Sequence, residues 1–255
     1  MPWYVPQKYF DRYPLEEIIL PKTIINDRDD LPEFGKRFAR ERYSASWGSD
    51  LNEGIQDHDL VLEYDQWQRG VQSYLASISF VDDYVGKILD ALERSKYAEN
   101  TIVVLWGDHG WHLGEKQHWR KQALWEDTTH VPFIVSFPAK ISQNQICNAP
   151  VSLIDIFPTL IDLSGLPEKD DLDVKSLVPL LKNPTMDWDR PVLTTYGKGN
   201  HAVRSGMWRY IQYQDGGSEL YDHQKDPHEW FNISDKEGYK DVVAELKTHL
   251  PKQEK

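Results

Sequence analysis

Residues 101–132 read TIVVLWGDHGWHLGEKQHWRKQALWEDTTHVP, and the prediction of the fold starts from them. The segment opens with a β-branched and aromatic run, Thr101 to Trp106, which predicts a strand. Gly107 follows, and then come Asp108, His109 and Gly110. An acid and an imidazole therefore stand just beyond the carboxyl end of the strand. In open α/β sheets this is the place where ligands bind.

Asp108 and His109 together make half of a site for a divalent cation, because a carboxylate oxygen and a neutral imidazole are both metal ligands. Four of the nine histidines fall between positions 109 and 130, namely His109, His112, His118 and His130. The residues alone leave two interpretations open. One is a metal site, and the other is a solvated loop whose histidines only cap or hydrogen-bond.

The composition is that of an ordinary globular protein, with 255 residues, 40% hydrophobic and 27% charged. This length suits one large domain or a domain with a small appendage. The net charge of −12 argues against nucleic acid as a partner, since phosphates require a basic surface. A single cysteine, Cys147, excludes an internal disulfide framework and a multi-cysteine zinc site. No apolar run approaches the ~20 residues that span a bilayer, and no signal-peptide pattern opens the chain, so no membrane partner is predicted.

The clearest predicted helix is Asp65 to Lys96, where apolar residues recur at three- and four-residue steps and Asp65 is the expected N-cap. Phe133 to Phe137 predicts a second strand. A helix is expected within residues 148–165, ended by Gly165, and one or two turns at Ser176 to Leu181. Residues 14–64 are expected to be irregular, apart from a short helix at Arg37 to Tyr43.

The composition changes near Asp187 to Pro191, which predicts a boundary between residues 1–190 and residues 191–255. In the second part, His201 to Tyr213 alternates as a strand does. The Asp215-Gly216-Gly217 turn follows, and Ser218 to Tyr221 returns as the partner strand of a hairpin. Glu237 to Leu250 predicts a terminal amphipathic helix. Residues 191–255 should therefore form a small antiparallel sheet with one helix.

Three groups of residues resemble the second signature block of the sulfatases: Gly-Asp-His-Gly-Trp-His-Leu-Gly-Glu, then His118 to Lys121, then Thr129 to Pro132. The resemblance is closest to the iduronate-2-sulfatase and choline-sulfatase branch, and a weaker similarity reaches from Pro2-Trp3 to Asp226-Pro227. It implies an α/β fold: the C-terminal part of an alkaline-phosphatase-like mixed-sheet core flanked by helices, with the small antiparallel sheet attached. It also implies a hydrolase of sulfate esters, on sulfated sugars such as glycosaminoglycans or on similar sulfate esters.

The resemblance assigns roles to particular residues. Asp108 and His109 correspond to two ligands of a single Ca²⁺ site, and Lys121 to the lysine that binds the sulfate group. His118, three residues before Lys121, would share a face with it if the segment were helical, and would then act on substrate or leaving group. Glu115 and His201 are assigned to substrate binding. Glu115 is expected to buttress its loop more than it touches substrate, and His201 lies in a glycine-flanked loop.

One part of the family pattern is not encoded. The family nucleophile is a formylglycine made from Cys or Ser in a Cys/Ser-x-Pro-x-Arg stretch, whereas Cys147 is followed by Asn-Ala-Pro. We therefore expect this chain to be the C-terminal portion of a sulfatase, inactive alone, with the missing N-terminal half as a partner. Two alternatives stay open. The chain could be a phosphodiesterase or phosphonate hydrolase of the same superfamily, or a non-catalytic module that binds an anionic glycan.

Overall fold

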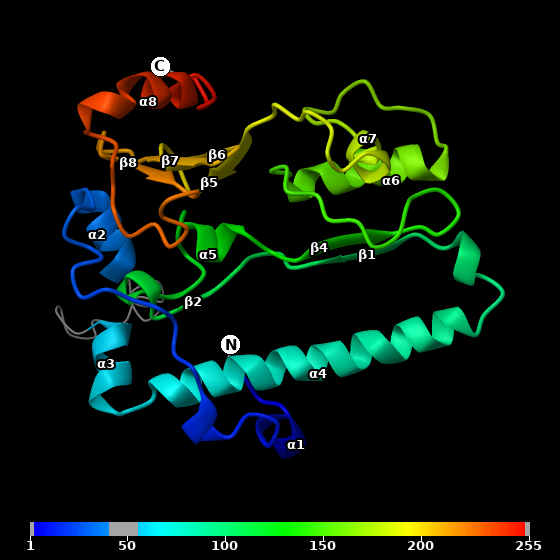
Figure 1. Cartoon of the computed structure of the whole chain (residues 1–255), viewed down its shortest axis with the longest axis horizontal. Helices are drawn as coiled ribbons and strands as arrows, with labels where there is room; N and C mark the ends of the chain where they lie inside the picture. Colours follow the sequence, from blue (N-terminus) through cyan, green and yellow to red (C-terminus); the bar gives the residue numbers. More distant parts are fainter. Residues whose placement is uncertain (1–2, 41–55, 253–255) are drawn as a thin grey trace. The chain divides into compact units, whose positions relative to one another are not determined.

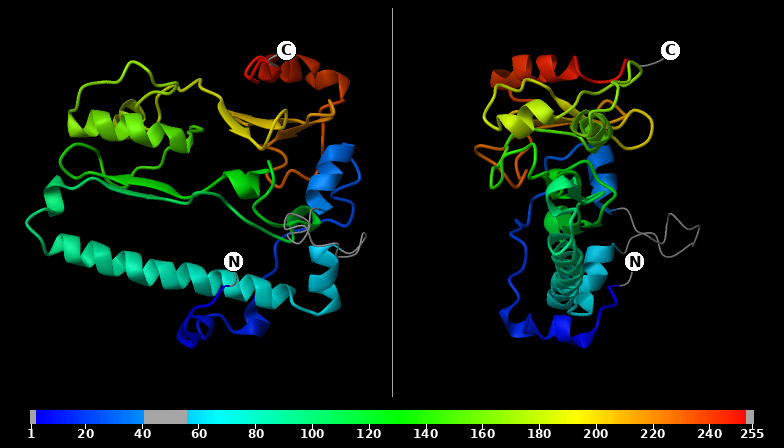
Figure 2. Two further views of the ribbon diagram at one scale, coloured as in Figure 1. Left: turned by 180° about the vertical axis from the view of Figure 1, so that it is seen from behind. Right: turned by 90° about the vertical axis from the view of Figure 1, so that its right-hand side faces the viewer.

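The longest element is the helix α4, Trp67–Glu93, which Figures 1 and 2 show as one unbroken helix. Its apolar residues follow the predicted spacing, and Val71 and Ala76 are buried. The predicted helix is therefore confirmed, but its predicted N-cap is wrong. Asp65 lies outside the helix at φ +51°, and Gln66 takes the N-cap position. The chain turns sharply between the helix α3 (Asp57–Glu63) and α4, and Asp is among the residues that tolerate this left-handed conformation.

The computed structural model describes residues 3–40 and 56–252, and it divides into two compact units. The first unit comprises Met1–Asp29, Lys36–Ala98 and Trp111–Lys121. The second unit comprises Asp30–Gly35, Glu99–Gly110 and Gln122–Lys255. Among the described residues, no helix has both the length and the apolarity that a membrane crossing requires.

The first unit contains more helix than the sequence predicted. Besides α4 it holds α1 (Gln7–Phe10), η1 (Leu15–Glu17), α3 (Asp57–Glu63) and the end of α2 (Glu33–Arg40), so the prediction of an irregular region over residues 14–64 is partly wrong. These helices are short, and prolines lie between several of them, so the sequence shows little periodicity here. The helix expected at Arg37 to Tyr43 starts earlier, at Glu33, and its last three residues lie outside the described part.

A short antiparallel pair completes the first unit. β2 (His112–Leu113) pairs with β3 (Trp119–Arg120), and η4 (Glu115–Gln117) connects them. The core of this unit packs Ile18, Val71, Leu113 and Trp119 together, with Trp3, Tyr74 and Trp111 against them. The aromatic N-terminal segment is thus held in place by this core.

Two glycines of α4 offer a matched test of this packing. A Cβ on Gly70 would lie 3.1 Å from the ring of Trp119, whereas a Cβ on Gly86 would meet nothing within 4 Å. Gly86→Ala should therefore stabilise the protein by ~0.5–1 kcal/mol, the usual gain inside a helix. Gly70→Ala should gain less or destabilise, because Trp119 is buried and donates a hydrogen bond to His58. Urea denaturation of both variants measures the difference. Equal gains in stability in the two variants would show that the Trp119 side chain shifts at no cost to accommodate the added methyl group.

In the second unit, β1 (Val103–Trp106) pairs antiparallel with β4 (Phe133–Ser136), with Val104 opposite Val135. Both predicted strands are confirmed. The helices α6 (Ile156–Ser164) and α7 (Val178–Lys182) are confirmed as well, and Gly165 ends α6 at φ +67°. Phe137, Ile141, Leu163 and Val178 form the core of this region. The other short elements of the unit are η3 (Ala98–Asn100), α5 (Glu126–Thr129) and η5 (Leu153–Asp155).

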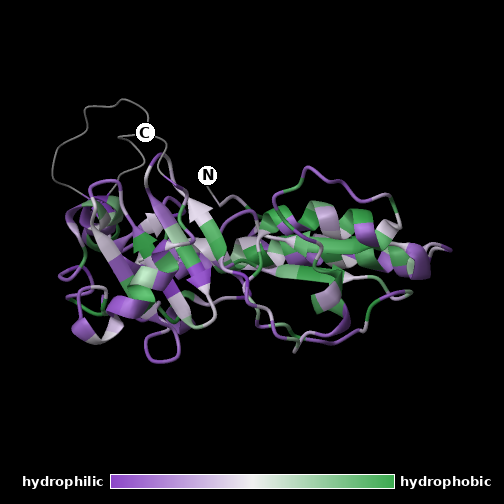
Figure 3. Ribbon diagram, turned by 90° about the horizontal axis from the view of Figure 1, so that it is seen from above, coloured by the Kyte–Doolittle hydropathy of each residue, from purple (hydrophilic) through white to green (hydrophobic). Residues whose placement is uncertain are grey.

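A four-stranded antiparallel sheet follows, with the strand order β5-β6-β7-β8. Its strands are β5 (Val192–Thr195), β6 (His201–Ser205), β7 (Trp208–Gln212) and β8 (Ser218–Asp222). Apolar and polar residues are mixed along these strands (Figure 3). The helix α8 (Lys240–Lys247), which follows η6 (Glu237–Tyr239), lies beside this sheet (Figure 1). Its Leu246 packs with Val203, Tyr210 and Leu220.

The predicted C-terminal sheet with one helix is confirmed, but the predicted strand from His201 to Tyr213 is wrong. It is two strands, because the chain reverses at Gly206, φ +49°, and Ser205 pairs with Trp208. The alternation of apolar and polar residues continues through this tight turn, so the turn cannot be recognised from the sequence pattern alone. The turn predicted at Asp215-Gly216-Gly217 is present, and Gly216 lies there at φ +89°.

Candidate functional site

The loop after β1 holds Asp108 and His109 in a defined arrangement. His109 Nδ1 lies 2.9 Å from the carbonyl oxygen of Gly110, and a donor at Nδ1 directs the Nε2 lone pair outward. His109 Nε2 lies 3.6 Å from Asp108 Oδ2, and the Asp108 side chain is 83% exposed. The acid and the imidazole predicted to act together therefore do face one another.

Gly110 fixes this loop against the segment that follows. Its N–H donates to the carbonyl of Thr128 at 2.8 Å, and a Cβ at Gly110 would lie 2.0 Å from the carbonyl oxygen of Asp127. No side chain fits in that space. The glycine of the Asp-His-Gly sequence is thus required by the close approach of two backbone segments.

The donor set fits a divalent cation. Ca²⁺ takes oxygen ligands at about 2.3–2.6 Å, and two ligands of one such ion lie about 3–4 Å apart. The 3.6 Å separation of Asp108 Oδ2 and His109 Nε2 agrees with that spacing. Asp108 would supply the hard anionic oxygen, and His109 a nitrogen whose tautomer is set by Gly110. A cation held there would draw negative charge from a bound ester oxygen.

Residues 114–120 form a loop with an unusual backbone. Lys116 and Gln117 each have φ +51°, Arg120 has φ +79° and Gly114 has φ +120°. Non-glycine residues seldom adopt positive φ angles, and residues with such backbone strain are often found at functional sites. Lys116 is held there by Asp27: its Nζ lies 3.0 Å from Asp27 Oδ1, and both side chains are at most 3% exposed. This pair could not be predicted from the sequence, because nothing local links two residues 89 positions apart.

His118 is buried, and its segment is not helical, so the condition under which it would share a face with Lys121 is not met. Gly114 and the positive φ angles turn the chain so that His118 leads into β3, whereas Lys121 is exposed. His118 Nδ1 lies 3.2 Å from the carbonyl oxygen of Ala39, and its ring lies 5.1 Å from that of His112. Burial lowers the pKa of His118 from 6.5 to about 4, and burial also lowers the pKa of His112 well below its usual value. Both rings are therefore neutral at pH 7, and the catalytic role of His118 stays a prediction.

These two histidines should make stability fall in mild acid. The unfolded chain binds a proton on His118 near pH 6.5 and the folded chain only near pH 4, so the free energy of unfolding should fall by up to ~3 kcal/mol between these values. His118→Gln should flatten this slope in urea denaturation at pH 7.5 and 4.5. His249→Gln, at an exposed position, serves as the control. An unchanged slope in His118→Gln would contradict the burial of a neutral ring.

The other predicted site residues are distributed over both units. Glu115 and Lys121 belong to the first unit, and His201 belongs to the second with Asp108 and His109. Glu115 accepts a hydrogen bond from the backbone N–H of Leu113 at 2.6 Å, which buttresses its loop. His201 begins β6, and its Nδ1 lies 2.8 Å from Thr195 Oγ1. The substrate-binding roles of Glu115 and His201 stay predictions.

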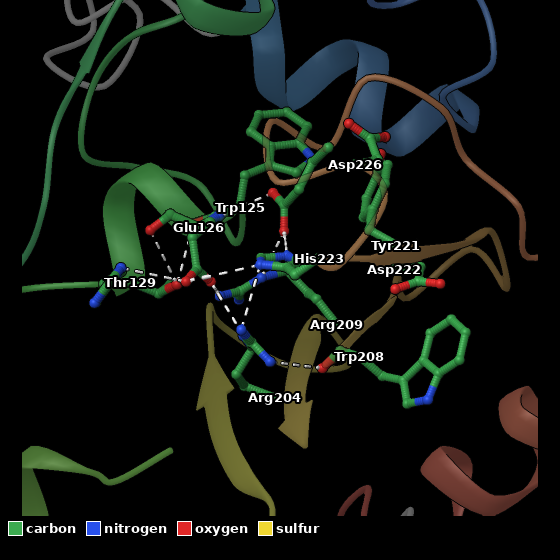
Figure 4. Close-up of polar contacts among 12 residues, drawn as sticks. Trp125, Glu126, Thr129, Arg204, Trp208, Arg209, Tyr221, Asp222, His223 and Asp226 are labelled. Carbon is green, nitrogen blue, oxygen red and sulfur yellow. Dashed lines mark hydrogen bonds and ion pairs between the residues drawn. The ribbon is translucent and has the colours of Figure 1, made fainter. Parts of the chain in front are cut away.

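Figure 4 shows an ion-pair cluster in the second unit that the sequence analysis did not predict. Arg209 pairs with Glu126 and with Glu229, and Arg204 pairs with Glu126. His223 Nε2 lies 2.8 Å from Glu229. Burial opposes ionisation, but Arg209 and Arg204 lower the pKa of Glu126 to about 2.

The ligand atoms of Glu126, His223 and Glu229 lie within 4.8 Å of one another, a spacing that a metal could use. The two arginines already supply the positive charge that a metal would bring. We therefore interpret this cluster as the anchor of α5 on the C-terminal sheet, since Glu126 begins α5 and Arg204 and Arg209 lie on β6 and β7.

This α/β arrangement, with its separate antiparallel sheet, is the alkaline-phosphatase-like fold. Solved structures agree with it: the protein BT4656, in complex with its substrate D-glucosamine-2-N,6-O-disulfate, is 26% identical with a TM-score of 0.67, over 80% of this chain and 43% of its own. A phosphonate monoester hydrolase from Silicibacter pomeroyi has a TM-score of 0.77 at 22% identity, over 95% of this chain and 51% of its own. The second likeness shows the fold alone.

Comparison of the sequence with known families defines a narrower class of protein than the fold does. The Sulfatase family model matches residues 5–166, and the model described as N-sulphoglucosamine sulphohydrolase, C-terminal, matches residues 114–255. A sulfatase of Formosa agariphila is 42% identical over 99% of this chain and 47% of its own length. The choline-sulfatase of Rhizobium meliloti is 27% identical over 92% and 44%. The chain belongs to the sulfatase family, and it spans about half the length of these relatives.

Proposed function

We propose that this chain is part of a calcium-dependent sulfatase that hydrolyses sulfate esters of sugars. The observation that carries the proposal is the paired geometry of Asp108 and His109 after β1, in a chain 42% identical to a sulfatase. In this proposal Asp108 and His109 hold the cation, and Lys121 binds the sulfate oxygens. The two-donor arrangement and the family relationship support the proposal together.

The substrate class follows from the relatives. BT4656 is described in complex with its substrate D-glucosamine-2-N,6-O-disulfate, and another similar protein is an N-acetylglucosamine-6-O-sulfatase. We propose a sulfated sugar for this chain on that basis. We also propose that its residues correspond to the C-terminal portion of such an enzyme, of the iduronate-2-sulfatase and choline-sulfatase branch. The match of residues 114–255 to a C-terminal family model supports this correspondence.

In this proposal the nucleophile of the reaction comes from another segment and not from Asp108, His109 or Lys121. A cation and a lysine polarise an ester, but a covalent intermediate needs an activated nucleophile. We propose that a segment with the Cys/Ser-x-Pro-x-Arg pattern, converted to formylglycine, supplies it. The competing candidate is a phosphonate monoester hydrolase, favoured only by the likeness in fold.

The test is an assay of purified residues 1–255 with calcium, alone and with a nucleophile-bearing segment of a sulfatase supplied. The substrates are an aryl sulfate, a sulfated disaccharide and a phenyl phosphonate monoester. We expect sulfate release only with the added segment. Faster cleavage of the phosphonate would support the competing candidate. Sulfate release by the chain alone would mean that it contains an unrecognised nucleophile.

Asp108→Asn and His109→Ala should each weaken calcium binding by the assembled enzyme at least tenfold, since a hard cation loses its anionic or its nitrogen donor. Calorimetry with calcium measures the affinity. Asp82→Asn, at an exposed position of α4, is the control and should bind calcium as the parent does. Unchanged affinity in both site variants would refute the assignment of the ligands.

A further inference from the structure

The loop of residues 107–110, which carries the proposed cation ligands, is fixed at both ends by one later segment of the second unit. The Gly107 N–H donates to the carbonyl of Pro132 at 3.0 Å, and the Gly110 N–H donates to the carbonyl of Thr128 at 2.8 Å. Thr128 is a buried residue of α5. The position of α5 therefore decides where this loop lies.

The helix α5 cannot hold that position by itself. It has four residues, and its N-cap residue, Trp125, makes no side-chain capping hydrogen bond. A helix of this length is unstable alone, and its first N–H groups need acceptors from elsewhere. Glu229 supplies one of them, because its Oε2 accepts a hydrogen bond from the Glu126 N–H at 2.9 Å. A carboxylate 103 positions later in the chain thus caps α5.

Glu229 lies in a strained and buried conformation. Its φ is +57°, and the residue is 2% exposed. Its Oε1 lies 2.8 Å from His223 Nε2 and 2.7 Å from Arg209 Nε. Burial opposes ionisation of Glu229, but Arg209 and His223 lower its pKa below the usual value, so it is a carboxylate at pH 7. Such backbone strain persists only where the surroundings fix it, and it is often found at functional sites.

Arg209 holds the residues on both sides of Trp125. Its guanidinium donates to the carbonyl of Leu124 at 3.1 Å and pairs with the carboxylate of Glu126 (Figure 4). The Arg209 side chain is 3% exposed. A planar guanidinium reaches several acceptors at fixed angles, which a lysine ammonium on its flexible stem does not. Arg209 and Glu229 together therefore fix the start of α5.

We propose that Arg209 and Glu229 are positioning residues for the cation half-site. By fixing α5 they hold the loop of residues 107–110 in the geometry in which Asp108 and His109 face one another. They act through the backbone and touch neither the cation nor the substrate. The inference rests on the proposed function, in which this half-site binds calcium.

The first test is amide hydrogen exchange of residues 1–255 in EDTA. Glu229→Ala should speed exchange at Gly110 about tenfold, which corresponds to the loss of one hydrogen bond. Arg209→Lys keeps the charge but loses the planar fork, and it should speed this exchange as well. Asp155→Asn is the matched control, because Asp155 is another buried carboxylate of the second unit, paired with an arginine but lying in η5. It should lower stability and leave exchange at Gly110 as in the parent.

The second test is calorimetry with calcium on the assembled enzyme. Glu229→Ala and Arg209→Lys should each raise the Kd for calcium about tenfold, as changes behind the ligands of a metal do. Asp155→Asn should bind calcium as the parent does.

Exchange at Gly110 at the parent rate in either Glu229→Ala or Arg209→Lys would overturn the proposal. So would parental calcium affinity in both variants. If Glu229→Ala does not fold, Arg209→Lys decides alone. Neither test uses a sulfate ester. A failed sulfatase assay would therefore refute the proposed function and leave these results standing, whereas parental values here would refute only the positioning role.

Discussion

Replacing Lys121 with alanine should lower the turnover of a sulfate ester by the assembled enzyme about 10²–10³-fold, with little change in the free energy of unfolding. In the proposed site the ammonium group of Lys121 faces the oxygens on which negative charge develops. Loss of one such charged donor removes stabilisation of the transition state. The side chain is exposed, so its removal creates no cavity.

The measurement is kcat for an aryl sulfate at saturating calcium, together with urea denaturation. Lys22→Ala is the matched control, because Lys22 is another exposed lysine of the first unit. It should retain the parent rate. Lys121→Arg keeps the charge but changes its shape, and it should recover part of the lost rate. Parental turnover in Lys121→Ala would show that Lys121 is only a surface lysine.

Asp27→Asn should destabilise the protein by ~3–5 kcal/mol, because it removes the carboxylate charge that lies 3.0 Å from the buried Lys116 ammonium. Asp27 also accepts a hydrogen bond from the Lys116 backbone N–H at 3.2 Å. Its loss should therefore release the strained backbone of residues 114–120. Turnover should fall too, since Lys121 follows this loop directly.

Chemical denaturation of Asp27→Asn beside Asp29→Asn checks this expectation, because Asp29 is exposed two residues away. The double variant Asp27→Asn with Lys116→Met removes both charges and should recover much of the stability. Equal stability of Asp27→Asn and Asp29→Asn would mean that the pair contributes nothing net.

Periodicity predicted the parts of the fold in which burial repeats regularly. The long helix α4 and the strands β1 and β4 were readable because each presents a repeating apolar pattern. The short helix α3 and the reversal at Gly206 could not be predicted, because each involves too few residues to show a repeating apolar pattern.

The candidate site likewise has one part that the sequence predicts and another part that it does not. The Asp108–His109 pair is local, so its facing geometry could be anticipated from adjacent residues. The burial of His118 and the Lys116–Asp27 pair depend on segments distant in sequence, Ala39 and Asp27. Residues 118–121 are not helical, because the φ angles around Gly114 turn the chain, so the shared face that helical spacing would give His118 and Lys121 does not form. The roles of Lys121, His118, Glu115 and His201 stay predictions.

The close contact of Gly110 with Asp127 and Thr128 has a consequence for the order of events during synthesis. Those residues belong to α5, which is anchored by Arg209 and Glu229, residues 83 and 103 positions after Glu126. When Asp108 and His109 leave the ribosome, the chain that supports their loop has not yet been made. The cation half-site should therefore reach its final shape only after most of the C-terminal sheet has been translated. A nascent chain stalled before residue 204 should lack it.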